Sequence, residues 1–200
     1  MLRLAAFVCF LLLAPTARAD AAAIVGKPAP AFELLDASGE STQLSAFKGK
    51  YVVLEWVNFQ CPFVGKHYGS GNMQVLQKRY TDKGVVWLSI CSSAPGKQGH
   101  VTGAEAKELI TEKNAAPSRF LLDPKGVVGK KYGAKTTPHI YVINPKGVLV
   151  YNGAIDDRPS TKQADIKGAK NYLTAALEST MAGQRVEIAA TQPYGCSVKY

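Results

Sequence analysis

Cysteine is scarce in this 200-residue sequence, and the four cysteines that it contains lie far apart, at positions 9, 61, 91 and 196. They therefore supply no set of four close ligands for a structural zinc ion. The sequence also has no internal repeat and no low-complexity tract, as is usual for a globular protein. The lysines behind its formal net charge of +9 are spread along the chain without a recognisable nucleic-acid-binding module. We therefore expect no nucleic-acid partner.

No apolar run in the sequence reaches the length of about 20 residues that spans a bilayer. The N-terminus instead combines a basic residue, Arg3, with the short apolar run Leu4–Leu13 and an Ala-Arg-Ala motif that ends at Ala19. This pattern is typical of a secretory signal peptide at residues 1–19, and we predict cleavage after Ala19. Cys9 then leaves with the signal, and the mature protein is periplasmic or secreted, without membrane insertion.

The mature sequence keeps an odd number of cysteines, Cys61, Cys91 and Cys196. Disulfides form and persist in exported proteins, so the odd count needs an explanation. Either one pair forms and one thiol stays free, or the pairing changes during a reaction cycle. The length of the mature chain is enough for one domain, which we place at residues 20–184. A tail at residues 185–200 follows and carries Cys196.

The hydrophobic pattern predicts strands alternating with helices. Strands are expected at residues 32–35, 42–44, 51–57, 85–90, 119–122, 140–143 and 148–151. Helices are expected at residues 62–82, with a kink or break at Gly69-Ser-Gly71, and at 102–114, 127–132 and 164–181. This order predicts an α/β sheet that starts parallel and ends antiparallel, with an N-terminal β-hairpin.

Cys61 and Cys91 each end one of the two apolar strands of the predicted parallel sheet. Ligand chemistry in open α/β sheets gathers at the carboxyl ends of the strands, so both sulfurs are expected at one edge. Cys61 is followed by Pro62, which suits the first position of a helix. A sulfur at a helix N-terminus is stabilised as a thiolate by the partial positive charge there, which predicts a reactive cysteine.

Four segments of the sequence resemble the thioredoxin-like superfamily, in its redoxin or peroxiredoxin-like (AhpC/TSA-type) branch. The segments are Val25-Gly-Lys-Pro-Ala-Pro-Ala-Phe32, Leu44-Ser-Ala-Phe-Lys-Gly49, Cys61-Pro62 and Thr137-Pro138-His139. The Gly-Cys-Ser-Val-Lys ending at residues 195–199 resembles a subgroup with a single Cys-Pro motif. The resemblance covers residues 24 to 180 and implies a thioredoxin-like fold, with a mixed central sheet and flanking helices. It also implies that Pro138 is a cis-proline whose backbone lies against Cys61.

The sequence departs from the patterns of both neighbouring families. Thioredoxin-type reductases have a second cysteine three residues after the first, where this chain has Val64. Typical peroxiredoxins place a threonine three residues before the cysteine, and here that position is Asn58. They also place an arginine just before the later core strand, where this chain has Thr137 and Pro138. The resemblance therefore implies thiol chemistry without an in-motif partner for Cys61.

We assign Cys61 as the nucleophile, which attacks a peroxide or a partner disulfide. Cys196 is the candidate resolving thiol and Cys91 the alternative, and a static Cys91–Cys196 clip that pins the tail is also open. The favoured interpretation of Cys91 itself is a buried free thiol. Five residues are expected to shape the substrate site, namely Asn58, Gln60, Pro62, Thr137 and Pro138.

Other polar residues near the motif receive structural interpretations. Lys66 is expected to be a solvated helix residue, and His139 a hydrogen-bonded strand histidine rather than a general base. Arg119 could assist in binding an anion or a peroxide. A copper-binding module built from Cys61, His67, Met73 and His139 is an alternative, although their spacing matches no recognised cluster.

These observations predict an exported, peroxiredoxin-like thiol oxidoreductase that reduces peroxide and is reset by an external thiol reductant. The main alternative is a periplasmic thiol-disulfide reductase or exchange protein, and a third is a non-catalytic thiol or copper-binding module. The predicted reaction requires no organic cofactor and no metal.

Overall fold

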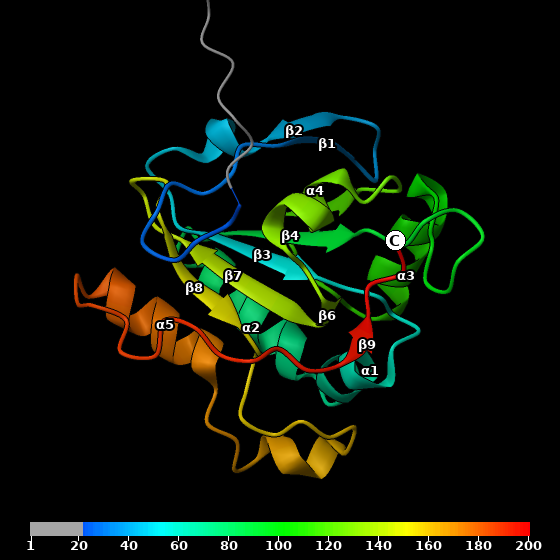
Figure 1. Cartoon of the computed structure of the whole chain (residues 1–200). Coiled ribbons are helices and arrows are strands. Elements are labelled where there is room, and N and C mark those ends of the chain that lie inside the picture. The colour runs from blue at the N-terminus through cyan, green and yellow to red at the C-terminus, as the bar shows by residue number, and fades with distance from the viewer. Residues whose placement is uncertain (1–21) are drawn as a thin grey trace, which may run out of the picture.

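The computed structural model describes residues 22–200, so the predicted signal peptide and Cys9 lie outside it. Its centre is a seven-stranded sheet with the strand order β2-β1-β5-β4-β3-β7-β8 (Figure 1). The strands are β1 (Glu33–Asp36), β2 (Ser41–Gln43), β3 (Val52–Trp56), β4 (Val86–Cys91), β5 (Arg119–Leu122), β7 (His139–Ile143) and β8 (Leu149–Gly153). A separate two-stranded sheet pairs β6 (Thr136–Thr137) with β9 (Cys196–Ser197).

The central sheet is mixed. β3, β4 and β5 run parallel to one another, whereas β7 is antiparallel to β3 and to β8, and the hairpin β1–β2 joins antiparallel to β5. Every residue of β3, β4 and β7 is buried, as expected for central strands with both faces covered. The arrangement confirms the predicted thioredoxin-like fold and the order of its parallel and antiparallel parts.

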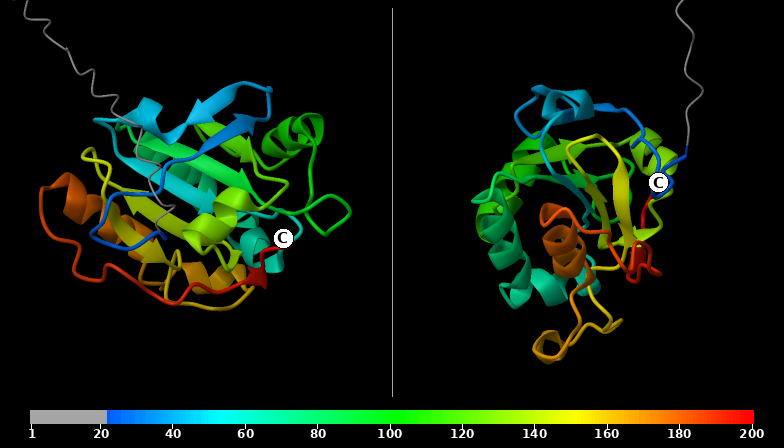
Figure 2. Two further views of the ribbon diagram at one scale, coloured as in Figure 1. Left: turned by 45° about the horizontal axis from the view of Figure 1, so that its top comes forward. Right: turned by 90° about the vertical axis from the view of Figure 1, so that its left-hand side faces the viewer.

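Helices cover both faces of the sheet. Their bounds are α1 (Pro62–Gly69), α2 (Asn72–Thr81), α3 (Gly103–Glu112), α4 (Val127–Tyr132) and α5 (Tyr172–Met181), with single 3-10 turns η1 (Leu44–Phe47) and η2 (Gln163–Ile166). Helices α1, α2, α3 and α5 pack on one face, and α4 packs on the other with the N-terminal segment (Figure 2). None of the helices within residues 22–200 is long and apolar enough to cross a membrane.

Local signals set several helix boundaries. The predicted capping box at α3 forms, since the Thr102 side chain accepts from the Glu105 N–H and the Glu105 carboxylate accepts from the Thr102 N–H. The predicted break between α1 and α2 also forms, because Gly71 adopts a φ of +75° that favours glycine.

The predicted helix at residues 164–181 is wrong in its first half. Residues Gln163–Ile166 form only a 3-10 turn, and the chain then leaves helical geometry around Gly168. Helix α5 begins anew because the Asn171 side chain accepts from the Thr174 N–H at 2.8 Å. A glycine and an N-cap residue inside the amphipathic pattern therefore divide it into two elements.

The tail, residues 185–200, follows the rim of the molecule from α5 to the far end of the sheet (Figure 1). It first lies along the edge strand β8, where Thr191 N–H donates to Asn152 O at 3.1 Å. It then pairs with β6 through β9 and ends where the Tyr200 hydroxyl donates to Ala134 O at 2.7 Å. The tail thus brings Cys196 from the C-terminus to the carboxyl end of β3.

Candidate active site

Cys61 lies where β3 ends and α1 begins. It is the N-cap residue of α1, with Pro62 at the first helical position as predicted. The Cys61 side chain is 1% exposed, and the N–H groups of the first helical turn point toward this end of the helix. The partial positive charge of the helix N-terminus therefore acts on a sulfur that is almost fully shielded from water.

The Thr137–Pro138 segment lies directly against this sulfur. The peptide bond between Thr137 and Pro138 is cis, as the resemblance implied. The Thr137 carbonyl oxygen is 3.0 Å from Cys61 Sγ and accepts a hydrogen bond from the neutral thiol. The Thr137 hydroxyl is buried and has no other hydrogen-bond partner among the described residues, which leaves it free to donate to a Cys61 thiolate.

Cys196 reaches the Thr137–Pro138 segment from the C-terminal tail. Strand β9 puts it directly opposite Thr137 in the β6–β9 pair, and the Thr137 carbonyl oxygen is the group that lies 3.0 Å from Cys61 Sγ. The structure therefore brings together the predicted nucleophile and the candidate resolving thiol, both as free thiols.

The two thiols have opposite acidities. Burial opposes the Cys61 thiolate, but hydrogen bonds from the Cys196 thiol, from the N–H groups of Val64 and Cys196 and from the Thr137 hydroxyl outweigh it. The pKa of Cys61 is therefore lowered. Burial, together with the hydrogen bond and charge of Cys61, raises the pKa of Cys196 to about 11. Cys61 is consequently the thiolate of the pair and Cys196 the proton donor.

Cys91 ends β4, the strand next to β3, but it is directed elsewhere. Its thiol donates to Gly99 O at 3.2 Å, and no hydrogen bond among residues 22–200 joins it to either of the other cysteines. It lines a cavity of about 170 Å³ together with the rings of Phe59 and Phe120. Burial raises the pKa of the Cys91 thiol, so it has the character of a structural cysteine.

Asn58 and Gln60 shape the turn before Cys61 but differ in exposure. Asn58 Oδ1 accepts from Gln60 N–H at 2.9 Å, and its amide donates to Gln98 O at 3.3 Å. Asn58 O also accepts from Cys61 N–H at 2.9 Å, which closes the turn. The Asn58 side chain is thus bonded within the turn and to the 93–101 loop, whereas Gln60 is exposed.

Both buried histidines near the site use their ring nitrogens for structural bonds. His139 Nε2 pairs with Asn152 Oδ1 at 2.7 Å, and its Nδ1 accepts from Lys135 N–H. His67 Nδ1 pairs with the Asn72 amide at 2.9 Å. Within residues 22–200 no three His, Cys, Asp or Glu side chains gather in a way that could hold a metal ion.

The expectation for Lys66 is wrong, and Arg119 lies outside the site. Lys66 is not a solvated helix residue, because its side chain is 1% exposed and its Nζ lies 3.1 Å from Asp156 Oδ2. Arg119 begins β5, at the edge of the sheet away from Cys61, where it pairs with Asp36 and Glu40. Sequence reasoning missed Lys66 because its buried partner, Asp156, lies 90 positions further along the chain.

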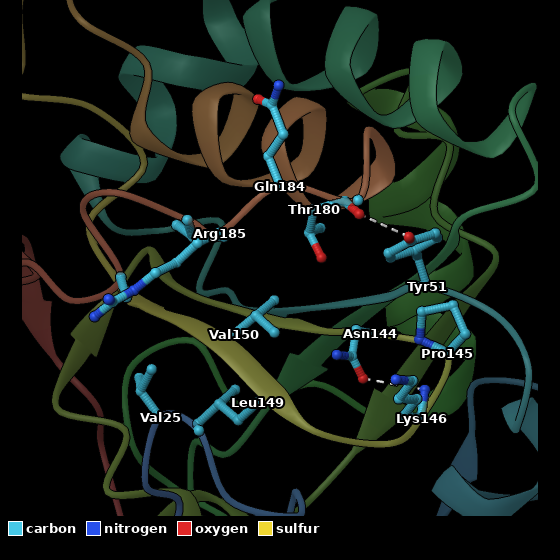
Figure 3. Close-up of a pocket in the computed structure, with 14 residues that line it drawn as sticks. Val25, Tyr51, Asn144, Pro145, Lys146, Leu149, Val150, Thr180, Gln184 and Arg185 are labelled. Carbon is cyan, nitrogen blue, oxygen red and sulfur yellow. Dashed lines mark hydrogen bonds between the residues drawn. The ribbon is translucent and has the colours of Figure 1, made fainter.

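A broader cavity of about 600 Å³ lies at the opposite end of the sheet (Figure 3). It is bordered by the β7–β8 turn, by Leu149 and Val150 of β8 and by the end of α5. None of the described residues that line it is cysteine or histidine, so the thiol chemistry of this chain is located elsewhere.

Comparisons with known proteins identify the family of the chain. The model of the AhpC/TSA family matches residues 25–152. The chain is 27% identical to the thioredoxin-like protein YneN of Bacillus subtilis, over 70% of this chain and 79% of that protein. It is 29% identical to a probable phospholipid hydroperoxide glutathione peroxidase of Solanum lycopersicum, over 68% of this chain and 89% of that protein.

A solved structure also resembles the whole domain. The crystal structure of an uncharacterized conserved protein from Geobacillus kaustophilus aligns with a TM-score of 0.73 and 27% identity. The alignment covers 89% of this chain and 93% of that one. The match therefore reaches beyond residues 25–152, the part covered by the family model.

Proposed function

We propose, because this chain belongs to the AhpC/TSA family, that it is an exported thiol peroxidase with Cys61 as nucleophile and Cys196 as resolving thiol. The observation that carries the proposal is the β6–β9 pairing, which places Cys196 opposite Thr137, the residue whose carbonyl oxygen lies 3.0 Å from Cys61 Sγ. The signal-like N-terminus supports export, and an oxidising compartment suits a cysteine pair that alternates between thiol and disulfide forms.

The proposed cycle has three steps. The Cys61 thiolate attacks one peroxide oxygen, the O–O bond breaks, and the alkoxide or hydroxide leaves as alcohol or water after taking a proton. Cys61 is then a sulfenic acid. The Cys196 thiol condenses with it, so a disulfide forms and water leaves with the Cys196 proton. Two electrons from an external thiol reductant restore both thiols.

The opposed pKa directions suit these steps. A lowered pKa increases the fraction of Cys61 that is thiolate, and the thiolate is the attacking form. A raised pKa keeps Cys196 protonated until a sulfenic acid stands opposite it, and its proton can then leave with the hydroxyl group. The pre-formed contact makes the resolving step intramolecular and favours it over attack by a second peroxide.

A second candidate is thiol–disulfide exchange with a partner protein. It is favoured by the groups around Cys61, because the described residues that hydrogen-bond its sulfur are neutral and include no arginine. Where peroxiredoxins have an arginine just before the later core strand, this chain has Thr137 and Pro138. In this case Cys61 attacks a disulfide sulfur, and Cys196 releases the mixed disulfide.

Peroxide consumption by the purified protein with a dithiol reductant tests the proposal. We expect Cys61→Ser to abolish consumption and Cys196→Ser to slow turnover with accumulation of Cys61 sulfinic acid, while Cys91→Ser, the matched control, turns over normally. Unchanged consumption in Cys61→Ser contradicts the peroxidase. If the wild type ignores peroxide but reduces insulin disulfides, the exchange function replaces it.

A further inference from the structure

A buried charged cluster, separate from the cysteines, holds the tail to the body of the protein. It consists of Lys66 and His67 on α1, Asp156 after β8 and Tyr194 in the tail. Lys66 is 1% exposed, His67 0% and Asp156 2%. Neither the proposed reaction nor the family resemblance uses these residues.

The Tyr194 hydroxyl forms hydrogen bonds with all three of the other side chains in this cluster. It donates to Asp156 Oδ1 and receives hydrogen bonds from Lys66 Nζ at 3.3 Å and from His67 Nε2 at 3.2 Å. His67 Nδ1 faces the Asn72 amide nitrogen, which can only donate, so the proton of His67 lies on Nε2 and points to Tyr194.

Departure of the tail leaves charged groups with a partner missing. The Lys66 ammonium has three donors, directed to Asp156, to Arg158 O at 2.7 Å and to Tyr194. Without Tyr194, one N–H donor of Lys66 and one carboxylate acceptor of Asp156 lose their hydrogen-bond partner. This is costly because the Lys66–Asp156 ion pair is buried away from water. The cluster therefore favours the docked tail.

Helix α1 connects this anchor to the reaction centre. It carries Cys61 at its N-cap and Lys66 and His67 at its centre, so the nucleophile and the anchor belong to one rigid element. Tyr194 also packs against Phe63 of the same helix, with ring centroids 5.9 Å apart. In the tail, only Gly195 separates Tyr194 from Cys196.

We propose that Tyr194 is a positioning residue, whose hydroxyl holds the Cys196 thiol beside Cys61 through the Lys66–Asp156–His67 cluster. This inference rests on the proposed pairing of Cys61 with Cys196. Loss of the hydroxyl frees the tail around Cys196, lowers the effective concentration of one thiol at the other, and lengthens the life of a Cys61 sulfenic acid.

Equilibration with reduced and oxidised glutathione measures this effect without peroxide. Oxidised glutathione takes two electrons from Cys61 and Cys196, and the disulfide fraction is read by mass spectrometry after acid quenching. For Tyr194→Phe we expect an equilibrium constant for the Cys61–Cys196 disulfide about tenfold lower than in the wild type. Tyr51→Phe is the matched control, since its hydroxyl bonds to Thr180 O at 2.8 Å at the other end of the sheet.

A second measurement separates positioning from loss of structure. In a Cys196→Ser background, Tyr194→Phe is expected to leave the alkylation rate of Cys61 by iodoacetamide within a factor of two. An equilibrium constant unchanged in Tyr194→Phe, or lowered equally in Tyr51→Phe, overturns the inference. A tenfold or larger change in the alkylation rate also overturns it, because the substitution then disturbs Cys61 itself.

The same preparations distinguish this inference from the proposed function. A wild type that forms the disulfide with glutathione but consumes no peroxide refutes the peroxidase, and the tenfold effect of Tyr194→Phe still supports positioning. A wild type that forms no Cys61–Cys196 disulfide at any glutathione ratio overturns the positioning role. Peroxide consumption, assayed separately, then tells whether Cys61 works without Cys196.

Discussion

Gly195 lies so close to Thr137 that a Cβ atom at position 195 would overlap with the Thr137 carbonyl oxygen. The same oxygen is 3.0 Å from Cys61 Sγ, so the tail, the cis-proline segment and the sulfur meet at one point. Gly195 also has a φ of +135°, a conformation that other residues rarely adopt. The close approach and the conformation both require glycine here, immediately before Cys196.

Gly195→Ala should therefore push the tail away from Thr137 and uncouple the two thiols. We expect the Cys61–Cys196 disulfide to form at least about tenfold more slowly after one equivalent of hydrogen peroxide, measured by quenched mass spectrometry. Gly168→Ala is the control, because a Cβ there meets no atom within 4 Å. Disulfide formation at the wild-type rate in Gly195→Ala would show that the contact does not position Cys196.

The Thr137 hydroxyl should stabilise the Cys61 thiolate. Thr137→Val removes a buried donor that faces the sulfur, so the pKa of Cys61 is expected to rise. A hydrogen bond to a charged group is worth roughly 1.5 kcal/mol, which corresponds to about tenfold slower alkylation by iodoacetamide at pH 7.

The matched control for this substitution is Thr136→Val. The Thr136 hydroxyl donates to Pro138 O at 3.1 Å rather than to the sulfur. Equal alkylation rates in wild type and Thr137→Val would exclude the hydroxyl as a thiolate donor. A comparable slowing in both valine variants would assign the effect to the β6 backbone.

Local signals in the sequence predicted most of the fold. β5 and α4 have the predicted bounds, because short apolar runs there are bordered by proline, glycine and charged residues. The same signals located Cys61 at a strand-to-helix junction. The helix predicted at residues 164–181 begins only at Tyr172, because periodicity did not register the interruption at Gly168 and the N-cap residue Asn171.

The identity of the second thiol could not be predicted locally. The tail has no periodicity, and Cys196 reaches the site only because β9 pairs with Thr137, about 60 positions earlier in the chain. Cys91 was the alternative, since it ends the strand next to β3, but its side chain is directed to the 93–101 loop. The burial of Lys66 could not be predicted from nearby residues either, because its partners Asp156 and Tyr194 lie far along the chain.

Cys91 should be the least reactive of the three mature cysteines. Its side chain is 4% exposed, and burial raises the pKa of its thiol, so little thiolate is available. We expect iodoacetamide to modify Cys61 first and Cys91 last in the native protein, as followed by peptide mass spectrometry. Cys91→Ala should cost about 1 kcal/mol of unfolding free energy and leave peroxide turnover unchanged. A turnover loss larger than the stability loss explains would place Cys91 in the reaction.

Stability should fall as the solution is acidified below pH 6.5, because two histidines are buried in the neutral form. Burial lowers the pKa of both His67 and His139 to about 4, against about 6.5 in the unfolded chain. Between these values the unfolded state binds more protons, so the stability from each neutral histidine is complete above pH 6.5 and is lost as the pH falls toward 4. The full loss is roughly 3 kcal/mol per histidine, of which roughly 2 kcal/mol is lost by pH 5.

The comparison of His139→Gln with the wild type isolates one of these contributions. Urea unfolding at pH 7.5 and pH 5 should show a drop in unfolding free energy that is smaller by roughly 2 kcal/mol in His139→Gln. His100→Gln is the control, since this histidine is partly exposed on a loop and lies outside the buried pair His67 and His139. Equal drops in all three proteins would mean that His139 is not held neutral by the fold. A smaller drop in both variants would point to a change in the unfolded state. In the folded structure, no hydrogen bond within residues 22–200 links His139 to His100.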